Sequence, residues 1–239
     1  GMIVAATEIG LEQLFPAADD HEIIDLSSLT ARVGQPLSAA LGLDDTIIEI
    51  DNKSMTHRPD LWGHYGLARE LAAVFDVRFK PARYPDITVE AKEKSLKLSV
   101  ETKDCYRCSA ILIDNFEVGP SPWWLRQRLE AVGLRSVNTV VDITNYVMLE
   151  VGHPMHAFDY DRIKGKISVR PVKKAEKVKT LNDLEYTLQP GTLVFADEEK
   201  KLDIAGIIGG QSSQIRPETK RILLTAANFK ATTVRTASV

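Results

Sequence analysis

The sequence lacks the features that mark several protein classes. No apolar run among its 239 residues approaches membrane-spanning length, and no signal-peptide pattern is present. The formal net charge of −3 at pH 7 gives no overall basic excess of the kind that general nucleic-acid binders carry. The sequence therefore predicts a cytoplasmic protein that is neither a membrane protein nor a DNA-binding protein.

Cysteine is also scarce, since the chain has only Cys105 and Cys108. A Cys-x-x-Cys pair suggests zinc or redox chemistry, but zinc normally needs four ligands and the sequence offers no second pair. The surrounding segment 107–118 is predicted to be a strand, in which residues three apart point to opposite faces. We therefore expect two reduced, inert thiols and no metal site.

Known hydrolase and nucleotide-binding motifs are absent. The chain has no Gly-x-Ser-x-Gly, no His-Glu-x-x-His and no P-loop lysine motif. The segment 206–210 is rich in glycine, but it lacks the residues that would hold phosphate and magnesium. Taken alone, it is typical of a tight turn or a bulge.

What is present is an ordinary globular composition, with 44% hydrophobic and 26% charged residues, enough for one or two domains. Helical patterns come first and period-two patterns follow, which predicts an α+β fold. We expect a mainly antiparallel sheet with helices packed on it, preceded by a smaller α+β segment. Helices are expected from Asp60, from Ser121 as N-cap, and over 139–149; strands over 46–50, 95–101, 107–118, 167–172, 192–196, 202–208 and 221–226; and a hairpin over 178–188 with Asn182-Asp183 at its turn.

The most informative stretch runs from Asn138 to Asp159. It places polar Thr144 and Asn145 inside an otherwise apolar helix and delivers His156 just after a Gly-His-Pro turn. Such polar residues compete with helix backbone bonds, so Thr144 and Asn145 are either capping or inter-helix hydrogen bonders, or parts of a site. His156 is either a core histidine bonded to backbone or a site residue with a pKa near neutrality.

This stretch resembles the editing domain of the bacterial phenylalanyl-tRNA synthetase β subunit. The segments 55–72 and 205–210 agree with the same family in order and spacing. The resemblance is strong over 121–239, good over 45–76 and loose elsewhere. It implies a piece of a longer subunit, with an N-terminal α+β segment over 1–118 and a tRNA-editing domain over 119–239.

The family's activity is hydrolysis of tyrosine wrongly esterified to tRNA(Phe), in support of phenylalanine–tRNA ligation and protein synthesis. Such a second site is needed because an apolar pocket excludes an added hydroxyl only weakly. The resemblance implies that His156 is catalytic and positions or polarises the water or the substrate. It also implies that Thr144, Asn145, Gly206 and Thr225 bind the substrate.

The partners implied are the acceptor end of tRNA(Phe) and the synthetase α subunit. No cofactor is expected in this part of the subunit, whereas ATP and magnesium serve the whole enzyme, whose aminoacylation step is not expected here. A run of cations, which includes Lys177 and Lys179, is either a solvated hairpin face or a weak phosphate contact with the acceptor end.

One departure from the family concerns Thr225, which stands where the family usually has a glutamate for the tyrosine phenol. A threonine hydroxyl can still accept a hydrogen bond, but it is shorter and uncharged. Two other functions stay open. The chain could be a docking module for tRNA or the α subunit with editing lost, or a structural spacer, against which Thr144, Asn145 and His156 argue.

Overall fold

The computed structural model describes residues 3–17, 19, 21–27, 29–87 and 96–238. The chain forms two compact units. Unit 1 comprises residues 1–58 and 120–146, and unit 2 comprises residues 59–119 and 147–239. Each unit is built from two separate stretches of sequence, which a single boundary after residue 118 does not reproduce. The division into domains at that position stays a prediction.

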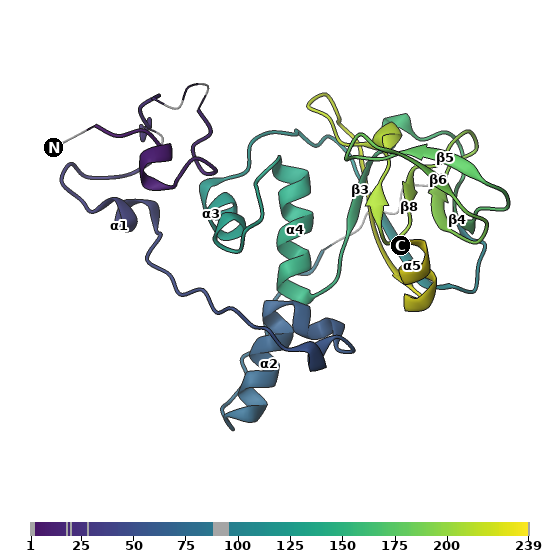
Figure 1. The fold of residues 1–239 in the computed structure, drawn as a ribbon, viewed down its shortest axis with the longest axis horizontal. Helices are drawn as coiled ribbons and strands as arrows, with labels where there is room; N and C mark the ends of the chain where they lie inside the picture. The colour runs from purple at the N-terminus through teal and green to yellow at the C-terminus, as the bar shows by residue number, and fades with distance from the viewer. Residues whose placement is uncertain (1–2, 18, 20, 28, 88–95, 239) are drawn as a thin grey trace. The chain divides into compact units, whose positions relative to one another are not determined.

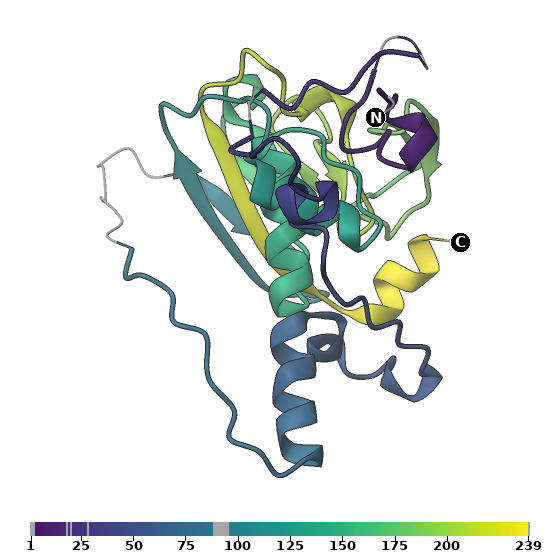
Figure 2. The same cartoon turned by 90° about the vertical axis from the view of Figure 1, so that its left-hand side faces the viewer.

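The first sheet of unit 2 has the strand order β2-β10-β3, and both of its pairings are antiparallel. Strand β2 is Cys105–Ile113, β3 is His156–Asp159 and β10 is Ile222–Phe229. The two long strands, β2 in teal and β10 in yellow, run side by side in Figure 2. The central strand β10 thus joins segments that lie far apart in the sequence.

The second sheet has the order β1-β4-β7, where β1 is parallel and β7 antiparallel to β4. Two short antiparallel pairs, β5-β6 and β8-β9, complete unit 2 (Figure 1). The bounds are Leu98–Val100 for β1, Ile167–Pro171 for β4, Glu176–Lys179 for β5, Glu185–Leu188 for β6, Leu193–Ala196 for β7, Asp203–Ile204 for β8 and Ile208–Gly209 for β9. The mainly antiparallel α+β fold expected from the sequence is confirmed.

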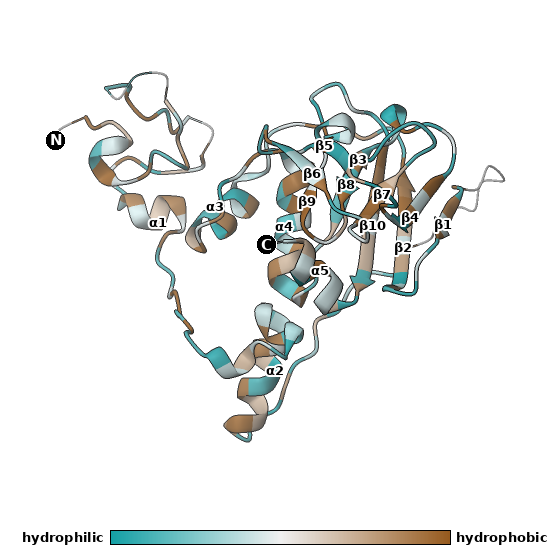
Figure 3. Cartoon of the chain, turned by 45° about the vertical axis from the view of Figure 1, so that its right-hand side comes forward, coloured by the Kyte–Doolittle hydropathy of each residue, from teal (hydrophilic) through white to brown (hydrophobic). Residues whose placement is uncertain are grey.

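Strand β7 lies at the centre of the core of unit 2, since all four of its residues are buried. Side chains alternate across a strand, so Leu193 and Phe195 enter one apolar cluster while Val194 and Ala196 enter another. Both clusters draw side chains from other strands: Phe158, Ile167, Val169 and Leu223 in the first, and Val178, Leu188 and Ile204 in the second. Figure 3 shows brown, hydrophobic residues along these strands.

The helix expected from Asp60 begins four residues later. Residues Pro59–Trp62 form a 3-10 turn, η3, and helix α2 is His64–Val74 with Gly63 at its N-cap. The turn packs directly on the helix, because a Cβ on Gly66 would lie 1.8 Å from the carbonyl oxygen of Asp60. The C-terminal turn of α2 is apolar (Figure 3), and Phe75, which follows it, is 69% exposed.

Short helices complete the described elements. Unit 2 also contains η4, Tyr160–Arg162, η5, Gln211–Ser213, and α5, Ala231–Ala237. Unit 1 contains η1, Thr7–Ile9, α1, Leu37–Leu41, η2, Lys53–Met55, and α3, Trp123–Ala131. Helix α4, Thr139–Val151, begins in unit 1 and is followed by Gly152, which has a φ of +75°. Among the described residues, none of these helices has the length and apolarity that crossing a membrane requires.

In unit 1, side chains of α3 bond to backbone carbonyls of the N-terminal stretch. The indole of Trp123 donates to the carbonyl of Leu41 at 3.1 Å, and Gln127 donates to the carbonyl of Gly42. Arg126 donates to the carbonyl of Leu14. Helix α3 therefore holds two loops of the N-terminal stretch by their carbonyl oxygens.

A buried carboxylate organises the second stretch of unit 1. Asp142 is fully buried and accepts hydrogen bonds from Ser121 Oγ at 2.5 Å, Ser136 Oγ at 2.5 Å and Val137 N at 2.8 Å. The prediction that Ser121 is the N-cap of α3 is wrong, because its hydroxyl bonds to Asp142 and Pro122 occupies the cap position.

Three expected strands also differ from the structure. Residues 46–50 form no strand, and Ile47 and Ile48 are 68% and 72% exposed, because an alternating segment stays single when no partner strand pairs with it. The strand expected over 107–118 begins at Cys105 and ends at Ile113. The strand expected over 95–101 is limited to β1, and Ser95 lies outside the described residues.

Candidate functional site

Two of the predicted site residues, His156 and Thr225, are direct neighbours across the first sheet. His156 on β3 pairs with Thr225 on β10, and residues opposite each other in an antiparallel pair point to the same face. Thr225 is only 3% exposed, and its hydroxyl donates to the backbone carbonyl of His156 at 3.2 Å. The pairing of the strands therefore fixes these two side chains relative to each other.

The imidazole of His156 is neutral at physiological pH. Burial lowers its pKa to about 4, because the charged form loses its hydration. The near-neutral pKa expected from the sequence is not found. Its ring packs against Phe158 with centroids 4.5 Å apart, and within the described part of the chain no group hydrogen-bonds its ring nitrogens. A neutral ring with free nitrogens can accept or donate one hydrogen bond to a ligand, but it is a weak base.

Gly209 on β9 leaves the room that the ring of His156 occupies. A Cβ at this position would lie 2.4 Å from His156 Cε1 and 2.7 Å from a methyl group of Leu181. Any other residue would force the imidazole to move. The sequence analysis did not single out Gly209, and its only signal was the pair of adjacent glycines at 209 and 210.

Gly206, predicted to bind substrate, occupies the turn between β8 and β9 with a φ of +74°. A Cβ there would lie 3.2 Å from side-chain atoms of Phe229 and Val234, which follow at the end of β10 and in α5. The glycine is required by the left-handed backbone and by this close packing. Its predicted contact with a ligand stays a prediction.

Thr144 and Asn145 lie in the part of α4 that belongs to unit 1. The hydroxyl of Thr144 donates to the carbonyl of Val141 at 2.7 Å, so this residue bonds within its own helix. The half-buried amide of Asn145 has no hydrogen-bond partner among the described residues. His156, Gly206 and Thr225 belong to unit 2, so the pocket expected to unite all five residues stays a prediction.

A buried acid lies on the same hairpin as Gly209. Asp203 on β8 pairs with Gly209, is 5% exposed and accepts a hydrogen bond from Phe195 N at 2.8 Å. Burial raises the pKa of Asp203 to about 8, so its carboxyl is largely protonated near neutrality. The sequence analysis missed this group because burial of a carboxyl is not visible in a local pattern.

The two cysteines are unreactive in this environment. Burial raises the pKa of Cys105, and it raises the pKa of Cys108 to about 11, so both remain protonated thiols at neutral pH. This agrees with the interpretation of inert thiols. Within the described ranges, no group of three or more His, Cys, Asp or Glu residues is arranged to hold a metal ion.

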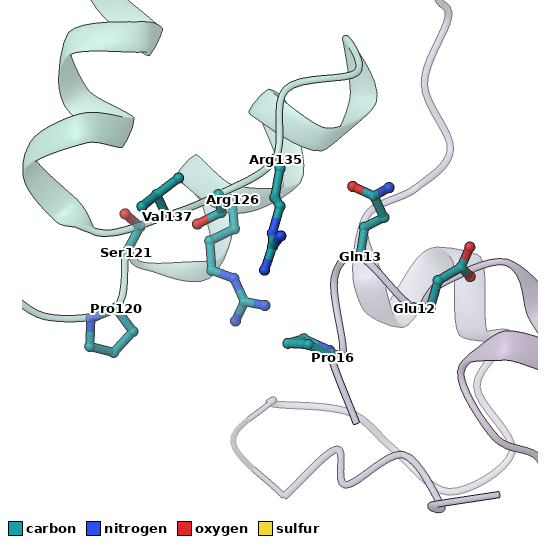
Figure 4. Close-up of a pocket in the computed structure, with 9 residues that line it drawn as sticks. Glu12, Gln13, Pro16, Pro120, Ser121, Arg126, Arg135 and Val137 are labelled. Carbon is teal, nitrogen blue, oxygen red and sulfur yellow. The ribbon is translucent and has the colours of Figure 1, made fainter. Parts of the chain in front are cut away.

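Unit 1 contains a cavity of about 450 Å³ into which Arg126 and Arg135 point (Figure 4). Arg126 is already used there, since it bonds to Leu14 and lies over the ring of Trp123 at 5.8 Å. The other lining residues are Glu12, Gln13, Pro16, Pro120, Ser121, Ser136 and Val137. None of the five predicted site residues lines this cavity.

Comparison with known proteins identifies relatives along the whole chain. A family model described as the B3/4 domain matches residues 104–239. The phenylalanine–tRNA ligase β subunit of Solibacter usitatus is 43% identical over 247 residues, and that of Geobacter metallireducens is 42% identical over 241. These matches cover 100% of this chain but only 30% and 29% of the relatives, so the chain spans less than a third of their length.

A solved structure also matches, although at a distance. It is an N-terminal fragment of the phenylalanyl-tRNA synthetase β subunit from Pyrococcus horikoshii, 19% identical with a TM-score of 0.46. The match covers 81% of this chain and 61% of that fragment.

Proposed function

We propose that this chain hydrolyses tyrosine wrongly esterified to tRNA(Phe). The premise is its family: the chain belongs to the B3/4 domain family and matches phenylalanine–tRNA ligase β subunits along its whole length. The bond broken is the ester between the amino acid and the 3′-terminal ribose, and water supplies the attacking oxygen. The partners are the acceptor end of that tRNA and the α subunit of the ligase. Aminoacylation itself, with ATP and magnesium, is assigned to other parts of the enzyme.

The observation that carries the proposal is the pairing of His156 with Thr225 on one face of the sheet. The ring nitrogens of His156 have no protein partner in the described part of the chain, and the missing side chain of Gly209 leaves the space that the ring occupies. Because the pKa of His156 is about 4, the ring acts by hydrogen bonding rather than as a strong base. It positions the attacking water or polarises the ester.

Thr225 then recognises the phenol hydroxyl of tyrosine by a hydrogen bond. Its own proton is given to the carbonyl of His156, which leaves the lone pairs of Oγ1 to accept a hydrogen bond. A phenol hydroxyl can donate that bond, whereas phenylalanine has no hydroxyl to offer. Discrimination by a neutral acceptor is weaker than discrimination by a carboxylate.

The experiment that tests the proposal is His156→Ala in the whole enzyme. Hydrolysis of Tyr-tRNA(Phe) should slow by roughly tenfold to a thousandfold, the range for loss of one catalytic donor or proton-handling group. Phenylalanine activation should stay unchanged. The matched control is His57→Ala, since His57 is exposed and lies in unit 1. Equal hydrolysis in both variants removes His156 from the mechanism.

The role of Thr225 is tested by restoring the family residue. Thr225→Glu should raise the ratio of Tyr-tRNA to Phe-tRNA hydrolysis, because a carboxylate bonded to a phenol contributes about 1.5–3 kcal/mol. Phenylalanine leaves the same carboxylate buried without a partner, which is unfavourable. Rates are measured for both charged tRNAs in both proteins. An unchanged ratio means that this position does not determine specificity.

A second function is a docking module for tRNA or the α subunit in which editing is lost. The low exposure of Thr225 favours it, because a side chain that is 97% buried presents little surface to a substrate. The two functions separate in the wild-type enzyme. Binding of tRNA(Phe) without any hydrolysis of its tyrosyl ester identifies the docking module.

A further inference from the structure

Unit 2 has a cavity of about 410 Å³ with a strongly basic lining. It lies between the β5-β6 hairpin, the turn before β8, and the segments around η4 and η5. Six cationic side chains line it: Arg162, Lys177, Lys179, Lys200, Lys201 and Arg216. Glu199 is the only carboxylate among the lining residues, whereas His156, Gly206 and Thr225 are not part of the lining.

Three of the lysines are neutralised by carboxylates. Lys201 lies 2.6 Å from Glu176, Lys177 lies 2.6 Å from Glu185, and Lys179 lies 3.8 Å from Asp183. The other three cations of the lining are Arg162, Lys200 and Arg216.

Arg162 and Lys200 bond to carbonyl oxygens rather than to carboxylates. Arg162 Nε donates to the carbonyl of Ser212 at 2.9 Å, and Lys200 Nζ donates to the carbonyl of Arg162 at 2.7 Å. Neither has an ion pair within the described residues, and the terminal nitrogens of Arg162 have no partner there. The two charges are thus fixed in position and uncompensated.

Arg216 carries a buried donor with nothing to donate to. Its Nε is the one buried side-chain nitrogen or oxygen, among the described residues, that lacks a hydrogen-bond partner. Its Nη1 lies 3.9 Å from the carboxylate of Glu218, a side chain that is 70% exposed. The backbone here is held firmly, since Arg216 N bonds to Thr219 Oγ1, which in turn donates to buried Asp159. The Nε–H of Arg216 is buried without an acceptor while the side chain as a whole is 37% exposed, so an acceptor from outside can reach the guanidinium.

We propose that this cavity is a phosphate site, and that it binds one phosphodiester of the RNA on which the proposed function acts. A phosphate offers several acceptor oxygens, which match the free N–H groups of Arg162 and Arg216 and the ammonium of Lys200. The inference rests on the proposed function for the identity of the RNA. Of the basic run noted in the sequence, only Lys177 and Lys179 line this cavity, whereas Arg162, Lys200 and Arg216 lie outside that run.

The direct test follows the Nε–H resonance of Arg216 by ¹⁵N–¹H NMR in the 239-residue protein, assigned from its loss in Arg216→Lys. A single-stranded RNA carrying the 3′-terminal sequence of tRNA(Phe) should shift this resonance, and so should millimolar inorganic phosphate. Sodium chloride at equal ionic strength should not. A shift with phosphate but none with RNA identifies a site for free anions and overturns the proposal, as does the absence of any shift.

Variants test the contribution to binding. Arg162→Gln and Arg216→Gln should each weaken binding of uncharged tRNA(Phe) by about tenfold at low salt. Each should also reduce the slope of log K against log salt by about 0.7, the loss expected for one phosphate contact on a single strand. The matched control is Lys220→Gln, which removes one charge from a lysine that is 59% exposed and outside the cavity. Slopes equal to that of the control overturn the proposal.

These measurements are independent of hydrolysis. All of them use uncharged RNA, so an enzyme that proves unable to deacylate Tyr-tRNA can still show the Arg216 shift and the change in salt slope. Conversely, normal editing with unaltered binding in both arginine variants removes the phosphate site and leaves the proposed function standing.

Discussion

Units 1 and 2 are stabilised in different ways. Unit 2 is held by two apolar clusters, in which Phe158 on β3, Val194 on β7 and Leu223 on β10 are fully buried. Unit 1 has buried apolar residues too, such as Leu125 and Leu129, but its loops are fixed by side-chain hydrogen bonds to backbone and to Asp142. Apolar burial is additive and tolerant of small shifts, whereas a hydrogen-bond network fails when one central acceptor is lost.

The largest expected effect is on the core of unit 2. Phe158→Ala should lower the free energy of unfolding by about 3–5 kcal/mol, because it leaves a cavity at a fully buried position. Urea denaturation measures this change. The same substitution at Phe75, which is 69% exposed, should change stability by less than about 0.5 kcal/mol. Similar losses in the two variants contradict the assignment of the core.

The next effect concerns the network in unit 1. Asp142→Ala should cost about 2–4 kcal/mol, since it removes a charged acceptor and leaves two serine hydroxyls and the N–H of Val137 without their partner. Asp44→Ala, at an exposed position in the same unit, serves as the control. Equal stability of the two variants means that unit 1 does not depend on this carboxylate.

Unit 2 should also lose stability as the pH rises. Asp203 has a folded pKa of about 8 against an ordinary value of 3.8, so between these values the folded state holds a proton that the unfolded state has lost. Stability therefore falls as pH rises from about 4 to about 8. Asp203→Asn should flatten this decline in a series of melting temperatures. An identical series for both proteins contradicts the buried, protonated state.

His156 acts in the opposite direction over a narrower range. Its folded pKa of about 4 lies below the ordinary 6.5, so the unfolded state binds the extra proton and stability rises with pH between these values. The two slopes oppose each other up to about pH 6.5, and only that of Asp203 continues above it. His156→Ala should therefore steepen the fall in melting temperature below pH 6.5, which the same series of melts measures.

The sequence predicted β4 and the β5-β6 hairpin well, whereas the single strand expected over 202–208 is two short strands, Asp203–Ile204 and Ile208–Gly209. Ile167 and Val169 face the core from β4, and the Asn182-Asp183 turn gives a hairpin with Asp183 at a φ of +64°. It failed over 46–50, where the alternation predicts a capacity to pair but says nothing about the presence of a partner. It also failed for Ser121, whose hydroxyl bonds to an acceptor 21 residues away rather than to the nearest helix.

The sequence predicted the identity of two residues of the candidate site but not their environment. The resemblance gave His156 and Thr225, and the sheet places them opposite each other. The depressed pKa of His156, the buried Asp203 and the unsatisfied Nε of Arg216 all depend on burial by distant residues, which no short segment reveals. Gly209 was missed for the same reason, because its need for a missing Cβ comes from a ring on another strand.

The position of β10 at the centre of its sheet has a consequence for synthesis on the ribosome. Strand β2 ends at Ile113, and its partner β10 is complete only at Phe229. At translation speeds of about 5–20 residues per second, β2 and β3 have unpaired edges for on the order of ten seconds. Exposed strand edges favour aggregation, so the nascent chain is most vulnerable in that interval. Slower translation between these strands should lower the soluble yield even though the finished protein is unchanged.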